Sequence, residues 1–434
     1  MRATRRDPIA LGAWLLVVVA GGAVGRALYA DDPLVRIGNA PLVGSADIRL
    51  SWWAVPALVF APIAVAAGPR IAATLRWRRL LVVAGLAALA WTVALALTDG
   101  PDALSAPLET RYEYLAAVDR VGSPTAFLSS FTDVLATYPT HVKGHPPGLV
   151  LALAGMDGIG LGGGGWAAAL VLLGGALMVP AALVAQRALG GEQAARATAP
   201  FLVLLPGAVW LGTSADGLFA GVAAVGIALF TVAATARGTP TDPTHGRRVA
   251  VRADVLALAA GVVLGLALHL SYGIAPLGAV VIAVAVACRA WRATVVAGLG
   301  VGAVALGFVA AGFWWFDGLA ATRELYFAGV ASRRPYLEFL LIDLAAFALV
   351  VGPAAAVGLA RLRDRGTWIL CGGALVALSS AALSGLSRGE TERIWLPFAP
   401  WIVLATCALR GSRAWLGAAA ALGLAVQLGA RSPW

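Results

Sequence analysis

The sequence predicts an all-α fold, a polytopic transmembrane bundle of about thirteen helices. Hydrophobic residues make up 60% of the 434-residue chain, charged residues make up 12%, and the mean hydropathy is +0.85. A soluble domain carries about 25% charged residues, so this chain has too little polar surface to be one. Its apolar runs are about 17 to 24 residues long, the length of helix that crosses roughly 30 Å of hydrocarbon. They lack the alternating pattern of outer-membrane strands.

The apolar runs give the helices in order along the chain. The first run follows the N-terminal arginines and is too long for a signal peptide, and no small-residue cleavage site follows it, so we expect a membrane helix there. The predicted spans are 9–30, 52–68, 80–98, 166–187, 197–214, 216–236, 253–272, 274–289, 293–315, 337–360, 367–385, 395–410 and 412–430.

The arginines orient this bundle. With the N-terminus in the cytoplasm, most arginines fall in short cytoplasmic loops and most acidic residues fall outside, which is the usual charge bias of membrane proteins. The sequence therefore predicts a multi-pass protein of the plasma membrane with a cytoplasmic N-terminus. The pI near 10.3 reflects these loop arginines, so the lipid bilayer is the expected partner and nucleic acid is not. The arginines include Arg2, Arg70, Arg196, Arg237, Arg361 and Arg410.

A long outer loop, residues 99–165, is the predicted extracytoplasmic active site. From Asp99 to Gly148 it holds six carboxylates and ends in His-Val-Lys-Gly-His-Pro-Pro-Gly, a polar cluster with no packing reason to exist in a membrane protein. Its apolar piece, Leu149 to Met156, is too short to span, so we expect a helix at the outer interface, begun by Pro146 and Pro147. Loops this long are usually functional or disordered, and aromatic anchors favour an ordered one here.

The carboxylates of this loop are candidate general bases. Glu109 and Glu113 lie four residues apart and would share one face of a helix. We rank Glu113, next to Tyr114, first as the base, followed by Glu109 and Asp99. The alternative is a solvated surface helix with no catalytic role.

The histidines of the same loop form a second candidate group. His141, Lys143 and His145 are close enough in sequence to surround an anion or a substrate. His-x-x-x-His on a helix would also suit a metal, but Gly144 and the following prolines argue against a continuous helix. We therefore assign no metal ligands and no certain cofactor, and a divalent metal ion remains an open alternative. A structural cap for the interfacial helix is the other reading.

Two aspartates stand at or within predicted spans. Asp216 lies at the outer end of a span and is a candidate substrate-site residue, although Asp is also a good N-cap. Asp343 falls inside an apolar helix and should face a cavity or a partner, since a carboxylate is costly in lipid.

Outer arginines are candidates to bind a phosphate, because the guanidinium group offers a planar fork of donors. Arg388 and Arg393 flank Glu390 and Glu392 in the outer loop 386–394, and Arg334 lies in the outer loop 316–336. We include Glu392 among the substrate-site residues. The alternative is a surface network in which the carboxylates only neutralise the arginines.

The order of these parts resembles the GT-C superfamily of membrane glycosyltransferases, closest to the protein mannosyltransferase and aminoarabinose transferase branch. A helix at 80–98 leads into an acidic outer loop, His145-Pro146-Pro147 opens an interfacial helix, and Asp216 follows at an outer helix end. The resemblance covers about 80–236. Two features depart from the family pattern: the acidic pair is spread out, and two helices precede the matching first helix.

The resemblance implies a GT-C-like organisation in three parts: two extra N-terminal helices in 1–79, a catalytic core in 80–236, and C-terminal helices in 237–434. It also implies a sugar donor on a polyprenyl phosphate and transfer to an envelope glycan, lipid or protein at the outer face. A carboxylate would act as base and the lipid phosphate would leave. The alternatives are a lipid or glycan transporter or flippase, and an inactive scaffold of the same fold.

Overall fold

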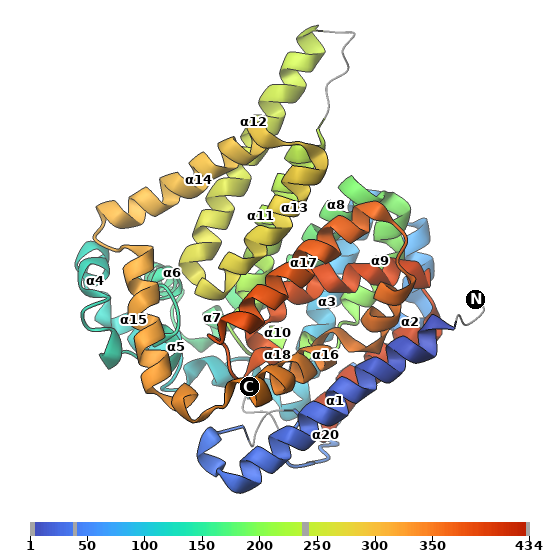
Figure 1. Ribbon diagram of the computed structural model, residues 1–434, viewed down its shortest axis with the longest axis horizontal. Helices are drawn as coiled ribbons and strands as arrows, with labels where there is room; N and C mark the ends of the chain where they lie inside the picture. The colour runs from blue at the N-terminus through green and yellow to red at the C-terminus, as the bar shows by residue number, and fades with distance from the viewer. Residues whose placement is uncertain (1–4, 38–40, 237–242, 431–434) are drawn as a thin grey trace.

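The computed structural model describes residues 5–37, 41–236 and 243–430, and these residues form helices and connecting segments without a β-strand (Figure 1). Arg2 and Arg237, which the sequence predicts to be cytoplasmic, lie outside the described residues. The longer helices are α1 (Arg6–Asp31), α2 (Val55–Thr74), α3 (Trp77–Ala96), α7 (Gly164–Ala176), α8 (Met178–Gly190), α9 (Glu192–Val203), α11 (Asp216–Thr235), α12 (Pro243–Leu270), α13 (Gly278–Cys288), α14 (Trp291–Ala310), α15 (Trp315–Ala328), α16 (Tyr336–Arg361), α17 (Arg365–Ser384) and α20 (Arg413–Gly429).

Ten helical segments in the described part of the chain are long and apolar enough to cross a membrane, and each coincides with a predicted span. The other three predicted spans are shorter. The span expected at 197–214 breaks after α9 and resumes only as α10 (Ala208–Leu211), because Pro206 interrupts it. Those expected at 274–289 and 412–430 are α13 and α20, of 11 and 17 residues. The all-α, multi-pass class is confirmed, while the number of long spans is smaller than predicted.

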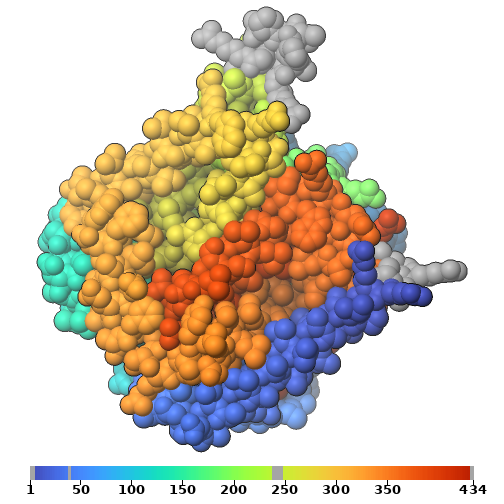
Figure 2. Space-filling view, viewed as in Figure 1, coloured from blue at the N-terminus to red at the C-terminus, as the bar shows by residue number. Residues whose placement is uncertain are grey.

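The core of the bundle surrounds α11 and the segment 391–409, which contains α18 (Thr391–Ile394) and α19 (Ala399–Val403). In their most apolar stretches, 72% and 89% of residues respectively are buried within the molecule, against 11% for α1 and for α14. Figure 2 shows α1 as a band along the edge of the molecule, packed beside α16. Charged side chains on the central segments are therefore shielded by protein, whereas α1 and α14 expose most of their surface.

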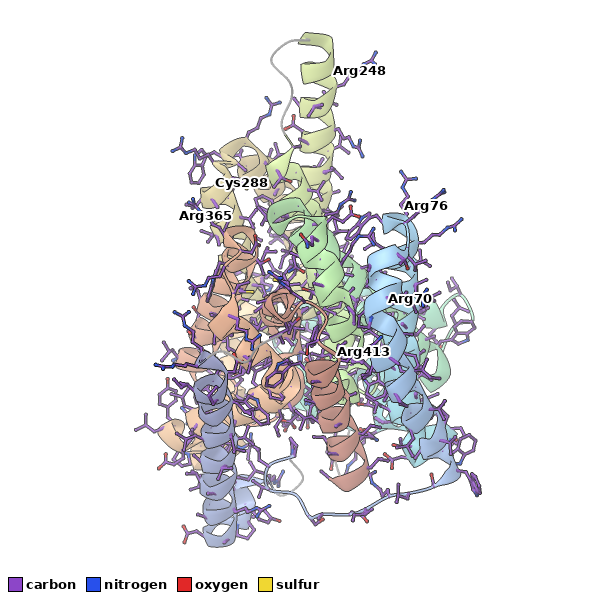
Figure 3. All side chains as sticks on the ribbon, turned by 90° about the vertical axis from the view of Figure 1, so that its right-hand side faces the viewer. Arg70, Arg76, Arg248, Cys288, Arg365 and Arg413 are labelled. Carbon is purple, nitrogen blue, oxygen red and sulfur yellow. The ribbon has the colours of Figure 1, made fainter. Side chains whose placement is uncertain are left out.

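The loops separate into two groups at opposite ends of the bundle. The end of α2, the start of α9 and the chain around 361–364 and 407–411 line one common cavity. The loops at 107–113, 140–141 and 389–392, all predicted to be outside, line another. Figure 3 shows Arg76, Arg248 and Arg365 in the upper part of the molecule. Which end faces the cytoplasm stays a prediction.

The loop 99–165 folds into short helices that gather with α15 at one side of Figure 1. They include α4 (Pro124–Ser130), α5 (Thr140–Lys143) and α6 (Gly148–Asp157). The short apolar helix predicted after the prolines is confirmed as α6, whose 10 residues extend only about 15 Å. Phe131 stacks on Tyr138, and Phe127 meets both rings edge-on, so the loop joins the main apolar core of the bundle.

Helix α16 connects the two ends of the molecule and is kinked between them. Gly352 has a φ of 73° and Pro353 follows it, so the regular hydrogen bonding of the helix is interrupted there. The carbonyl of Val350 instead accepts a hydrogen bond from the Gly207 amide at 3.0 Å, and a Cβ at position 352 would approach Pro206 to 2.9 Å. The break after α9 therefore packs into the kink of α16.

Candidate active site

A cavity of about 450 Å³ lies at the predicted outer end, and we call it the acidic cavity. Three parts of the chain that are distant in sequence build its walls: the connection between α1 and α2, the loop 99–165, and α16 with the turn that precedes α18. Its charged lining residues are four carboxylates and two arginines, together with one histidine: Glu113, Asp343, Glu390, Glu392, Arg36, Arg334 and His141.

Glu113 and His141 meet at the wall of this cavity. Glu113 precedes a 3₁₀ helix (Tyr114–Arg120), and the amide of His141 donates to the carbonyl of Tyr112 at 3.0 Å, which joins the two loop segments. The Oε1 atom of Glu113 lies 2.7 Å from Nδ1 of His141. The other oxygen, Oε2, is buried and has no hydrogen-bond partner among the described residues. One oxygen is thus fixed while the other can accept a proton.

Arg393 on α18 lies behind His141 and is almost fully buried. Its guanidinium contacts the carboxylate of Asp216 at 3.0 Å and that of Glu390 at 2.5 Å. A third contact, of 3.2 Å, reaches Nε2 of His141. Paired and hydrogen-bonded charges are the form in which a protein interior tolerates them.

These contacts set the hydrogen-bond roles of the two ring nitrogens of His141. A guanidinium group has donors only, so Nε2 of His141 must accept from Arg393. Nδ1, the other ring nitrogen, lies at hydrogen-bond distance from Glu113. Glu113 is therefore held by a histidine that Arg393 orients, and the chain of contacts continues to Asp216, which lies in the first turn of α11 and is not its N-cap.

Asp343 shapes the opposite wall of the cavity. It faces the cavity, as expected for a carboxylate in an apolar helix, and accepts hydrogen bonds from the Gly389 amide at 2.8 Å and the Thr391 hydroxyl at 3.4 Å. Gly389 and Glu390 both have positive φ, of 88° and 61°. Left-handed backbone is unfavourable for a residue with a side chain, so the Asp343 contacts hold a strained turn that aims Glu390 at Arg393.

The predicted phosphate arginines are engaged by the protein itself. Arg334 lines the cavity, but its guanidinium donates to the carbonyls of Val35, Arg36 and Arg388. Arg388 does not line the cavity; it donates to the carbonyls of Ala331 and Arg334. Both arginines therefore fasten the loops around the site.

Arg36 also lines the cavity, and sequence analysis did not identify it as a site residue. It has a φ of 54° and is exposed, and no hydrogen bond or ion pair engages its side chain among the described residues. It lies in the connection between α1 and α2, nearly 80 residues before the acidic loop motif, and only the folded chain brings it to the cavity. The turn sequence around it carries no motif that points to a ligand.

Several predicted site residues lie away from the acidic cavity. Asp99 is exposed, pairs with Arg49 and accepts from Gln427 at 3.0 Å. Glu109 is exposed beside Gly164 at the start of α7. Lys143 points to the carbonyl of Ala136, at 3.4 Å.

Tyr114 and His145 pack behind the cavity. Nδ1 of His145 lies 2.9 Å from the carbonyl of His141, and the ring of Tyr114 lies edge-on to His141, His145 and Phe219. Burial lowers the pKa of His145, so it is neutral near pH 7. Burial and the charges of Asp216 and Glu113 raise the pKa of Tyr114, so it remains a phenol. Both residues support His141 from behind.

Glu390 is ionised in this network. Burial alone would raise the pKa of Glu390, but the charge and hydrogen bond of Arg393 outweigh burial and lower that pKa. No group of three or more His, Cys, Asp or Glu side chains in the described ranges is arranged to hold a metal ion.

No protein-family model matches this chain, and no curated protein matches it. Among solved structures, it is similar to a crystal structure of ArnT from Cupriavidus metallidurans in the apo state, with 20% identity and a TM-score of 0.39. The similarity covers 73% of this chain and 58% of that one, so the chain spans less than two thirds of the length of ArnT. A likeness at this level does not place the chain in a family.

Proposed function

We propose that this protein is a GT-C-type membrane glycosyltransferase that transfers a sugar from a polyprenyl-phosphate donor to an envelope acceptor at the extracytoplasmic face. The observation that carries the proposal is Glu113: one carboxylate oxygen is fixed by His141, while the other is buried, without a partner among the described residues, at the wall of the acidic cavity. An oriented carboxylate with a free oxygen is what a general base requires.

In the proposed reaction, Oε2 of Glu113 takes the proton from the acceptor hydroxyl. The hydroxyl oxygen forms a bond to the anomeric carbon of the sugar. The bond between that carbon and the phosphate oxygen breaks, and the lipid phosphate leaves with the electron pair. His141 keeps Glu113 in place through its Nδ1 hydrogen bond, and Arg393 sets the tautomer that makes this bond possible.

The leaving phosphate needs a cation, and we assign this role to Arg36. Arg334 already donates to three carbonyl groups, and Arg393 to two carboxylates and His141, whereas the guanidinium of Arg36 is exposed at the cavity. Arginine binds phosphate oxygens through two parallel hydrogen bonds. The acidic turn with Glu390 and Glu392 would then face the sugar, whose hydroxyls can donate to carboxylates.

Glu113→Gln is the first test. Purified protein in lipid vesicles is supplied with a panel of radiolabelled polyprenyl-phosphate sugars and with cell-envelope extract as acceptor. Label should move from lipid to glycan, lipid or protein, and Glu113→Gln should slow this transfer by about one hundred- to ten-thousandfold, because it removes a base and keeps the shape. Donor binding should be nearly unchanged.

Glu109→Gln is the matched control, since it makes the same change in the same loop at an exposed position away from the cavity. It should turn over at the wild-type rate. Wild-type turnover by Glu113→Gln would remove Glu113 as the base. Label that crosses the bilayer but stays on its lipid would show that the protein is a flippase. No movement of label with any donor would favour an inactive scaffold.

A further inference from the structure

A second cavity, of about 860 Å³, lies at the end of the bundle opposite to the acidic cavity, and we call it the arginine cavity. Four loops meet there, at the ends of α2, α8, α16 and of the segment 391–409. Along α16, Asp343 at one cavity and Arg361 at the other are separated by about 27 Å of helix. The proposed transferase mechanism uses no residue of this region.

The cations of the arginine cavity divide into two pairs. The guanidinium of Arg196 is engaged by the protein: it donates to Glu192 and to the carbonyls of Ala72 and Leu75. Arg361 is bound to Asp7 on α1. These two arginines clamp neighbouring helices together and offer little to a ligand.

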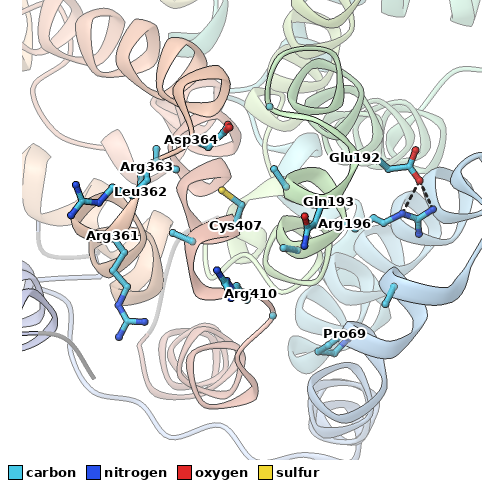
Figure 4. A pocket seen from close by; sticks show the side chains of 16 residues that line it. Pro69, Glu192, Gln193, Arg196, Arg361, Leu362, Arg363, Asp364, Cys407 and Arg410 are labelled. Atoms are coloured by element: carbon cyan, nitrogen blue, oxygen red, sulfur yellow. Dashed lines mark hydrogen bonds and ion pairs between the residues drawn. The ribbon is translucent and has the colours of Figure 1, made fainter. Parts of the chain in front are cut away.

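The other two, Arg363 and Arg410, are exposed, and among the described residues no hydrogen bond or ion pair engages their guanidinium groups. The one aspartate of the lining, Asp364, is already bound to the amide of Thr367 at 2.6 Å, where it caps α17. Figure 4 shows Arg410 in the middle of the cavity, with Arg361 and Arg363 on one side and the Arg196–Glu192 pair on the other. Arg363 and Arg410 therefore add two positive charges to the lining of one cavity, without a partner among the described residues.

The backbone conformation of Arg410 is a second feature of this position. Its φ of 51° is left-handed, a conformation that favours glycine and costs other residues about 1–2 kcal/mol. Gly411 follows with a φ of 68°, so the turn already contains the residue best suited to this geometry. Arginine therefore stands at 410 in a conformation where glycine would be more stable.

The floor of the cavity is apolar and made of small side chains, including Ala73, Ala194, Ala197 and Ala408, with Leu362 and Pro69 beside them. A volume near 860 Å³ is within the range of small-molecule sites and is far larger than a bare phosphate needs. Cations at the rim and an apolar floor suit a ligand with an anionic head and an apolar body.

We propose that the arginine cavity binds a phosphate-bearing ligand, whose phosphate group contacts Arg363 and Arg410. The phosphate comes either from an anionic phospholipid of the inner leaflet or from a free phosphate compound, and both share the chemistry that the two arginines recognise. The proposal is independent of the transferase function, because binding at this end requires neither donor nor turnover.

The test measures binding of a photoactivatable phosphatidylglycerol to the full-length protein in phosphatidylcholine nanodiscs. The double variant Arg410→Gly with Arg363→Gln should weaken phosphatidylglycerol binding roughly thirtyfold. Each of the two arginines near an anionic headgroup contributes a similar share of the binding free energy. Crosslinks should fall on peptides around 194–197 and 408–411. Glycine at 410 suits the left-handed backbone, so this variant loses the cation without being destabilised there.

The matched control is Arg248→Gln with Arg252→Gln, which removes the same charge from exposed positions on α12 outside the cavity. It should bind within twofold of the wild type. Competition by inorganic phosphate or glycerol phosphate as strong as that by short-chain phosphatidylglycerol would identify a free phosphate compound as the ligand, and weak competition would identify the lipid. Equal binding by the double variant and its control overturns the proposal.

Discussion

The acidic cavity and the arginine cavity use charge in opposite ways. In the acidic cavity, Arg393 is buried and shares its donors among Asp216, Glu390 and His141, so its charge maintains geometry. In the arginine cavity, Arg363 and Arg410 are exposed and unpaired within the described chain. A buried charge with protein partners positions other groups, whereas an exposed charge without them is available to a ligand. The same residue type therefore has different uses at the two ends.

Replacing Arg393 by Gln should have the largest effect on this comparison. It leaves the carboxylates of Asp216 and Glu390 buried without their cation, and breaking a buried ion pair costs about 3–5 kcal/mol. The free energy of unfolding, measured by denaturant titration in detergent micelles, should fall by that amount, and transfer should be lost.

Arg388→Gln is the control for Arg393→Gln, because Arg388 donates to neutral carbonyl groups of Ala331 and Arg334. It should cost about 1–3 kcal/mol. Equal losses for the two variants would show that the Arg393 network is no more than ordinary hydrogen bonding.

A change of pH should affect stability at the acidic cavity but not ligand binding at the arginine cavity. Burial lowers the pKa of His145, so its contribution to stability is present above about pH 6.5 and is lost as the pH falls. Arg393 more than offsets burial at Glu390 and lowers that pKa, so a second loss should begin below about pH 4.5. Phosphatidylglycerol binding should stay constant between pH 8 and 5.5, because arginine and the phosphodiester remain charged.

Unfolding curves recorded from pH 8 to 4 would test this. His145→Gln should remove the first stage of the decline and leave the second. A first stage of unchanged size in that variant would show that another group causes it.

The smallest effect should come from Asp99→Asn. Asp99 is exposed and pairs with Arg49, and an exposed ion pair contributes about 0–1 kcal/mol. Turnover and stability should both remain near wild type. A severe loss of turnover would move the proposed base from Glu113 to Asp99 and would assign the acidic cavity a different role.

Much of the helical framework could be predicted from the sequence because apolar length determines a membrane span locally. The span expected at 197–214 failed because Pro206 breaks the helix, an interruption that apolar composition alone does not reveal. Helix α6 was predicted from its length and its flanking Pro and Gly residues, and the structure agrees.

The site was less predictable. The pairing of Glu113 with His141 and the contact of His141 with Arg393 join positions up to 252 residues apart, and no local pattern encodes them. Arg36 reaches the cavity only because the connection between α1 and α2 is fastened by Arg334. In the sequence, Arg388 and Arg334 look like free outer cations. The sequence contains no pattern that predicts their hydrogen bonds to backbone carbonyls.

The attachment of α1 has a consequence for how the protein is made. Trp14 and Asp7 on α1 bind Ala348 and Arg361 on α16, so α1 pairs with a helix synthesised some 300 residues later. At about 5–20 residues per second, α1 waits roughly 15–60 s in the bilayer before this partner exists. The contacts that hold α1 in the folded bundle therefore form only after α16 has been made.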